Sequence, residues 1–213
     1  MSFVPPRGGA AWRRARPALA LAVLLPLAGC VPPEGDGTLA SGAAAVPPAP
    51  RLSVQDAASR LPDEAAGFRR GQTLPARAPA TGQEVTYATP AARQRAAAVV
   101  KLAPVGPDLP DGAASPAASA AFQAELNDAV QGRDRARHMN ETRRFPLMVA
   151  GAPALDCAAL AGTFGRQPVE GLVCAGGVGG NLVRLRVSMP KVTPSLADAP
   201  AFASAIVAAL RAR

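Results

Sequence analysis

The sequence predicts an α+β domain, an antiparallel sheet with two helices packed on one face. Residues 181–189 alternate apolar and polar side chains, which is typical of a strand. Apolar residues recur at helical spacing in two segments, which begin near Ser115 and Asp198. The resulting order of strands, helix, strands and helix favours a layer of helices over a layer of antiparallel strands.

The first 29 of the 213 residues have the composition of an export signal. Four arginines and no acid lie within residues 1–16, and residues 18–28 form an apolar run broken only by Pro26. A helix of about 11 residues spans ~16 Å, roughly half of a bilayer core, so this run is too short to cross a membrane. We therefore expect a signal peptide, removed in the mature protein, that uses the general secretory route.

The motif Leu27-Ala28-Gly29-Cys30 closes the apolar run and resembles the lipobox of bacterial lipoprotein precursors at all four positions. The resemblance covers only the first 30 residues. It implies that the thiol of Cys30 is joined to diacylglycerol, that the leader is cut before Cys30, and that the new amine is acylated, with palmitate among the expected chains. Several acyl chains anchor a protein stably where one chain is marginal. The alternative is an ordinary secretory signal in which Cys30 is incidental.

Residues 30–50 are rich in Pro, Gly and Ala and show no hydrophobic period, so they predict a disordered tether. A chain of about 20 such residues spans ~25 Å root-mean-square. The alternative is that part of this segment packs on the domain. By the same lipoprotein resemblance, Val31 after the cysteine favours the outer membrane over the inner. The single domain, residues 51–213, would then face the periplasm.

The formal net charge of +8 overstates the charge of the exported domain. Four of the 23 basic residues lie in the leader and none of the 15 acids does, so 19 basic residues remain and the balance falls to +4. Trp12, the only tryptophan, also lies in the leader, which argues against aromatic stacking platforms in the mature protein. Export also separates the protein from nucleic acid, so we expect no nucleic-acid partner.

The first part of the domain predicts one short helix and two strands. Ser53 begins a capping box, and Pro62 ends the helix that follows. Residues 67–79 show no regular period. Residues 84–89 alternate, and residues 95–102 end in β-branched valines, so we expect two strands. The alanines of the second segment leave a helix open as its alternative.

The second part predicts a helix from Pro116 to about His138, with Ser115 as its cap. The segments that follow are a strand at 145–150, an ambiguous strand or short helix at 155–164, an apolar strand at 169–175, a turn at 176–180, a strand at 181–189 and a helix from about 198 onward. This order is similar to that of PsbP-type folds. The similarity is one of topology, rests on no motif and implies no activity.

Two cysteines remain once Cys30 is assigned to the lipid. An exported domain with two thiols most often joins them, so Cys157 and Cys174 predict a structural disulfide. The chain-entropy model gives about 3 kcal/mol for a closed loop of ~16 residues. The alternative is a thiol pair in redox or metal service, which lacks a CxxC spacing here.

No catalytic constellation emerges from the sequence, so we expect no enzyme activity, no cofactor and no metal site. The glycine-rich run 176–180 invites comparison with phosphate-binding loops, but Leu182 breaks the GxGxxG pattern. His138 is the only histidine and lies among arginines, which is typical of a surface position.

Arginines are the most distinctive polar feature. Arg184 and Arg186 alternate along the predicted strand 181–189 and should project from one sheet face, about 7 Å apart. Five more arginines are close together in sequence: Arg133, Arg135, Arg137, Arg143 and Arg144. Planar guanidinium groups suit carboxylates and phosphates, so Arg184 and Arg186 are candidate anion-binding residues for a lipid head group, lipopolysaccharide or an acidic partner. A solvated face is the alternative.

These observations give three functional hypotheses. The first is a membrane-anchored envelope lipoprotein with a non-catalytic domain that binds a partner or supports envelope structure. The second is a module that binds a small anionic ligand through Arg184 and Arg186. The third is a hydrolase that uses acids and serine without histidine.

Overall fold

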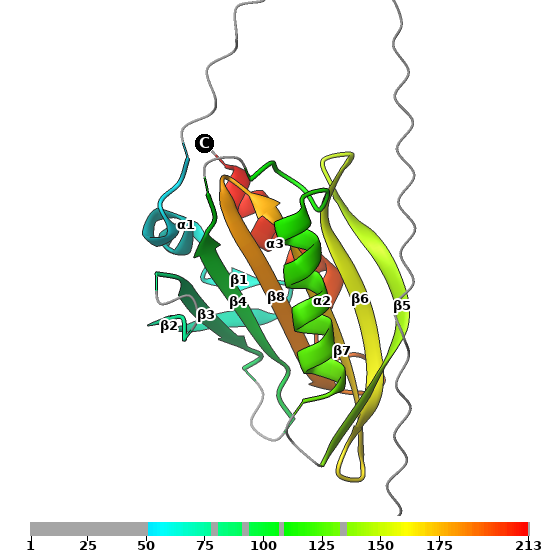
Figure 1. The fold of residues 1–213 in the computed structure, drawn as a ribbon. Helices are drawn as coiled ribbons and strands as arrows, with labels where there is room; N and C mark the ends of the chain where they lie inside the picture. The colour runs from blue at the N-terminus through cyan, green and yellow to red at the C-terminus, as the bar shows by residue number, and fades with distance from the viewer. Residues whose placement is uncertain (1–50, 78–80, 91–93, 107–108, 133–135, 213) are drawn as a thin grey trace, which may run out of the picture. The chain divides into compact units, whose positions relative to one another are not determined.

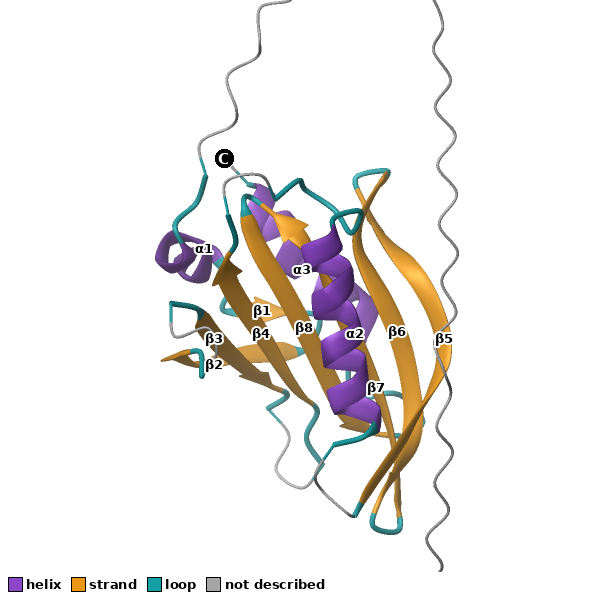
Figure 2. Cartoon of the chain, in the orientation of Figure 1, coloured by secondary structure: helices purple, strands orange, loops and turns teal. Residues whose placement is uncertain are grey.

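The computed structural model describes residues 51–77, 81–90, 94–106, 109–132 and 136–212, and these form one eight-stranded sheet with three helices (Figures 1 and 2). The strand order is β1-β2-β3-β4-β8-β7-β6-β5, and every neighbouring pair is antiparallel. The α+β class is therefore confirmed. The predicted leader, lipobox and tether lie outside the described residues.

The strands grow longer toward one side of the sheet. Their bounds are β1 Glu64–Ala65, β2 Phe68–Pro75, β3 Gln83–Ala88, β4 Ala97–Pro104, β5 Arg137–Val149, β6 Ala152–Phe164, β7 Gln167–Val178 and β8 Asn181–Pro190. The ambiguous segment 155–164 is thus a strand. The segment 67–79, expected to be irregular, contains β2. This strand has five consecutive exposed residues at its end, so it lacks the alternation by which strands are recognised in a sequence.

Three helices begin at side-chain caps, at the positions that the sequence predicts. They are α1 (Val54–Arg60), α2 (Pro116–Val130) and α3 (Ala199–Arg211). The side chains of Ser53, Ser115 and Asp198 each accept a hydrogen bond from the backbone N–H three residues later, which satisfies one of the unpaired donors of the first turn.

Helix α2 is shorter than predicted. It ends at Val130 with Gln131 as its C-cap, and Gly132 follows. Glycine disfavours helix continuation because it loses the most conformational freedom on folding. The chain then enters β5, so His138 lies on a strand rather than at a helix end.

Helices α2 and α3 lie on opposite faces of the sheet, so packing of both on one face is not confirmed (Figure 1). Leu172 and Cys174 of β7 pack in the cluster that contains α3, whereas Val173 and Ala175 pack in the cluster that contains α2. Successive side chains of a strand point to opposite faces, so this division assigns one helix to each face. In agreement, Leu172–Val178 is continuously buried, as expected of a strand covered on both sides.

An aromatic cluster holds α3 against the first half of the sheet. The ring centroid of Phe202 on α3 lies 4.7 Å from that of Phe68 and 5.0 Å from that of Tyr87. All three side chains are buried, and the hydroxyl of Tyr87 donates to the carbonyl of Pro62 at 2.8 Å. Burial raises the pKa of Tyr87 to about 12, with the Arg70 charge opposing this shift.

The glycine-rich run divides between a strand and a two-residue turn. Gly179 and Gly180 have φ values of +59° and +78° and form the tip of the β7–β8 hairpin. Gly177 instead pairs within β7 and exchanges two backbone hydrogen bonds with Gly112, at 2.8 and 2.7 Å. A Cβ atom at Gly177 would overlap the carbonyl of Pro110, so only glycine lets this loop approach the sheet.

The chain joins the domain at this hairpin tip. The backbone N–H of Leu52 donates to the carbonyl of Gly179 at 3.3 Å, and the Asn181 amide donates to the carbonyl of Leu52 at 2.9 Å. Asp111 accepts from the N–H of Gly179 at 2.9 Å. The segment that follows residue 50 is therefore fixed at one end of β7 and β8.

Candidate functional site

The predicted disulfide is confirmed. Cys157 on β6 and Cys174 on β7 are directly opposite in the register and are bonded to each other. Both residues are fully buried, on the face that α3 covers. The bridge therefore links two central strands beneath the α3 layer.

Arg184 and Arg186 lie on one face, as predicted, but beneath α2. Nη1 of Arg184 lies 3.5 Å from Oε1 of Glu125, and Nζ of Lys101 lies 2.9 Å from the same oxygen. Arg186 pairs with Asp128 one turn further along α2, at 2.5 Å. The side chains of Arg184 and Arg186 are 18% and 19% exposed, and α2 supplies a carboxylate to each. Glu125 is buried at 5% exposed, whereas Asp128 is 66% exposed. Binding of an external anion by these two residues stays a prediction, and such an anion would compete with those carboxylates.

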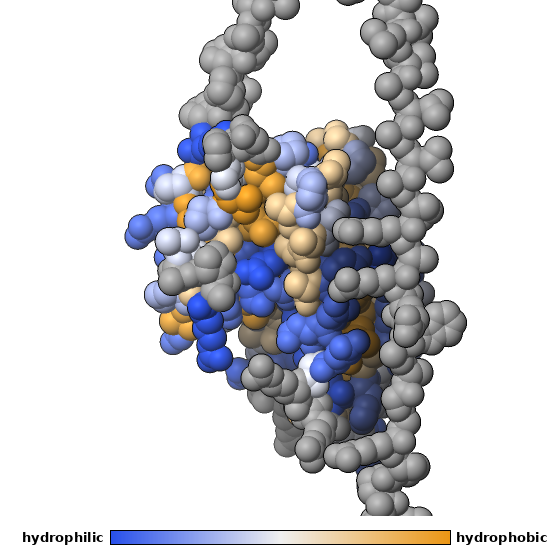
Figure 3. Space-filling view, in the orientation of Figure 1, coloured by the Kyte–Doolittle hydropathy of each residue, from blue (hydrophilic) through white to orange (hydrophobic). Residues whose placement is uncertain are grey.

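Figure 3 shows the α2 side, where pale, weakly hydrophobic side chains follow the helix, with a strongly hydrophobic patch beside its upper part and hydrophilic side chains beside its lower part. Ala120, Gln123 and Ala124 are among the exposed residues of α2.

His138, the only histidine, is exposed on β5. Glu64 of β1 pairs with Arg69 of β2 at the surface, at 3.0 Å. Within the described ranges, no group of three or more His, Cys, Asp or Glu side chains is arranged to hold a metal ion. No described helix is long and apolar enough to cross a membrane.

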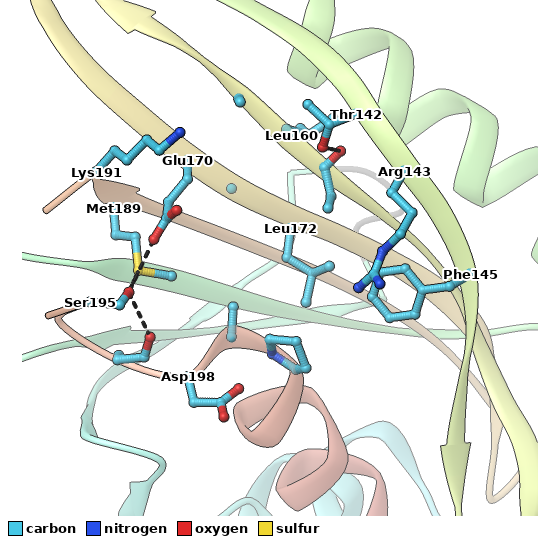
Figure 4. A pocket seen from close by; sticks show the side chains of 16 residues that line it. Thr142, Arg143, Phe145, Leu160, Glu170, Leu172, Met189, Lys191, Ser195 and Asp198 are labelled. Carbon is cyan, nitrogen blue, oxygen red and sulfur yellow. Dashed lines mark hydrogen bonds between the residues drawn. The ribbon is translucent and has the colours of Figure 1, made fainter. Parts of the chain in front are cut away.

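A cleft of about 630 Å³ lies on the α3 face, where the sheet extends beyond the start of the helix (Figure 4). A helix of 13 residues such as α3 spans only ~20 Å, whereas a strand of 12 residues such as β7 spans ~40 Å. Helix α3 therefore covers about half of the sheet face. The uncovered half forms the floor, and the segment from Lys191 to Pro200 forms one wall.

The strand register explains why the floor is hollow. Arg143, Ala159 and Leu172 form one row across β5, β6 and β7, and Ala161 lies opposite Glu170 in the next row. The two alanines of β6 place short side chains between longer ones on both neighbouring strands. The groove therefore runs along β6, with β5 on one side and β7 on the other.

Charged groups lie on both sides of the groove. On β5, the guanidinium carbon of Arg143 lies 4.6 Å from the ring centroid of Phe145. On the opposite side, Glu170 accepts a hydrogen bond from the Ser195 hydroxyl at 3.0 Å, and Asp198 accepts from the N–H of Ala201 at 2.9 Å (Figure 4). Both carboxylates thus have internal donors.

The cleft also contains two cations. Arg143 and Lys191 are exposed, and neither forms an ion pair within the part of the chain that the structure describes. In the sequence, Arg143 stands out only as one of several neighbouring arginines, and no sequence pattern predicts the cleft. A bulge between Glu141 and Arg143 changes which residues of β5 face α3, and the sequence pattern does not reveal it.

The cleft lies far from the point where the chain joins the domain. Met189 of β8 lines the cleft, and Asn181, at the other end of β8, binds Leu52. Eight residues of strand separate these positions, or ~27 Å. Likewise, the first turn of α3 lines the cleft, while Leu210 near its end lies beside Gly179.

Comparison with known proteins identifies no family for this chain. The chain matches no protein-family model, no curated protein and no solved structure.

Proposed function

We propose that this chain is a lipid-anchored bacterial envelope protein whose non-catalytic domain binds a partner through the cleft at the end of the sheet. The observation that carries the proposal is the separation between the cleft and Leu52. Because the two lie at opposite ends of β8, a tether that continues from Leu52 leaves the cleft accessible to a partner in the periplasm.

The anchor in this proposal rests on the lipobox and Cys30. A tether of about 20 residues allows ~25 Å between the membrane surface and the domain. The cleft is a further ~27 Å from Leu52 along β8, so the tether does not have to cross it. We propose a partner in the periplasm as the occupant of the cleft. The outer membrane is the proposed location of the anchor.

The chemistry of the cleft supports binding rather than catalysis. Ser195 donates to Glu170 and also lies 3.2 Å from the carbonyl oxygen of Ala197, so its hydroxyl is held within the wall. The apolar floor with a few polar groups at its margin is the usual composition of a ligand site, and the volume falls within the range of such sites.

Cross-linking in intact cells tests this proposal. A photoreactive amino acid at Thr142, in the cleft, should capture a specific partner, whereas the same group at Gln123, on the exposed face of α2, should not. In parallel, Cys30→Ala should move the protein out of the membrane fraction. Equal capture from both positions would show that the cleft is not the binding surface, and unchanged fractionation would show that Cys30 is not the anchor.

A further inference from the structure

We infer that the cleft binds an amphipathic anion, an apolar chain that carries a single carboxylate or phosphate group, with the charged group on Arg143. This inference rests on the proposed function, because it names the chemistry of the molecule or segment that the cleft receives.

Arg143 has the geometry of an anion-binding group. Its guanidinium carbon lies over the ring of Phe145, 4.6 Å from the ring centroid, within the range of a cation–π contact. A planar guanidinium donates two parallel hydrogen bonds to a carboxylate or a phosphate. Arg144 provides a contrast, because its Nε and Nη2 already donate to Glu141, at 2.9 and 3.0 Å.

The floor beside Arg143 suits an apolar chain. Leu172 and Met189 line the groove from β7 and β8, and Phe145 lines it from β5. The short side chains of Ala159 and Ala161 leave space between the larger side chains of β5 and β7. An acyl chain in this groove would remove apolar surface from water on both partners, which is favourable at about 25 cal/mol per Å².

The acids of the cleft lie on the other side of the groove. Glu170 and Asp198 are on the side of β7 and α3, while Arg143 is on β5 (Figure 4). A ligand whose anionic head group binds Arg143 therefore keeps its charge away from these carboxylates. Its apolar chain occupies the groove between the arginine and the carboxylates. Lys191 is a second exposed cation of the wall and lies on the side of Glu170, so Arg143 is the cation on the β5 side of the groove.

Calorimetric titration of three probes tests the inference. The protein is the chain from residue 30 with Cys30→Ser, which retains the whole compact unit that begins at Pro47. Decanoate and decyl phosphate should bind, and decanol, which has the same chain without charge, should bind at least tenfold more weakly. The stronger of the two anions then identifies a carboxylate or a phosphate as the natural head group.

Substitutions in and near the cleft show where the probes bind. Arg143→Gln should weaken binding of the preferred anion about tenfold or more and leave decanol unchanged, while Arg144→Gln, on the opposite face, should change neither. Ala161→Leu should fill the groove and weaken all three probes. Because Arg143 is exposed, its replacement removes no core contact.

Three results would overturn the inference. The first is equal binding of decanol and the two anions, and the second is no binding of any probe. The third is anion binding that Arg143→Gln leaves intact. In each case, a partner captured from Thr142 in cells would still support the proposed function, so failure of the inference and failure of the proposed function are distinguishable.

Discussion

Arg143 and Arg144 are adjacent in β5, yet their guanidinium groups lie over aromatic rings on opposite faces of the sheet. Arg143 lies 4.6 Å from the ring centroid of Phe145, on the cleft side, and Arg144 lies 5.0 Å from that of Phe122, on α2. One strand thus contributes a cation to each layer. Of the two, Arg144 is the one that forms an ion pair among the described residues, with Glu141, and the hydrogen bonds that Arg144 donates lower the pKa of Glu141.

The ion pairs beneath α2 give a first prediction. Glu125 is 5% exposed and lies between Lys101 and Arg184, so Glu125→Gln leaves two cations without their shared carboxylate. We expect a loss of about 3 kcal/mol in the free energy of unfolding. Glu64→Gln, which breaks an exposed pair with Arg69, should cost less than about 1 kcal/mol. Urea denaturation measures both, and equal costs would contradict the structural role of Glu125.

The disulfide gives a second prediction. Alkylation of the unfolded, unreduced Cys30→Ser chain should modify no cysteine, as read by intact mass. Replacement of both Cys157 and Cys174 by Ala should lower the free energy of unfolding by about 3 kcal/mol, because the unfolded chain gains the entropy of an open loop. Two alkylated thiols in the unreduced protein would refute the bridge.

The loop that contains Pro110 and Gly112 approaches β7 closely, which gives a third prediction. Gly177→Ala should destabilise the fold by about 1–3 kcal/mol, since its Cβ would overlap the backbone of Pro110. Gly106→Ala is the matched control, because a Cβ there meets no atom within 4 Å. The control should change stability by less than about 0.5 kcal/mol. A tolerated alanine at Gly177 would show that the loop does not rest on the sheet.

Tyr87 gives a prediction about pH. Its folded pKa of about 12 lies above the ordinary value of 10.0, so the native state keeps a proton that the unfolded state loses. Stability from this group is therefore present below pH 10 and falls as the pH rises from about 10 to 12. Tyr87 is the only tyrosine, so phenolate absorbance of the folded protein follows it alone. Titration near pH 10 in the folded protein would contradict its burial.

Local signals account for the parts of the fold that the sequence predicts correctly. Ser53, Ser115 and Asp198 mark the helix starts because a cap acts within one turn, and the alternation of residues 181–189 marks β8 because strand periodicity is local. The Cys157–Cys174 bridge is the pairing expected from the predicted export signal and the number of cysteines.

Non-local packing accounts for what the sequence does not reveal. The face that each helix covers depends on which side of β7 it meets, and α2 and α3 are both compatible with either side. Arg184 and Arg186 share a face as expected, but only the fold brings Glu125 and Asp128 over them. The cleft arises from a strand register and a β5 bulge that involve four strands, so no short motif encodes it.

The attachment of Leu52 to the hairpin tip has a mechanical consequence. If the predicted membrane anchor pulled on this segment while the cleft held a partner, the load would first reach the two hydrogen bonds that join Leu52 to Gly179 and Asn181. Because these bonds are few compared with those of the sheet, the segment would detach from the hairpin tip before any strand opened. The tether would then lengthen while the cleft kept its partner.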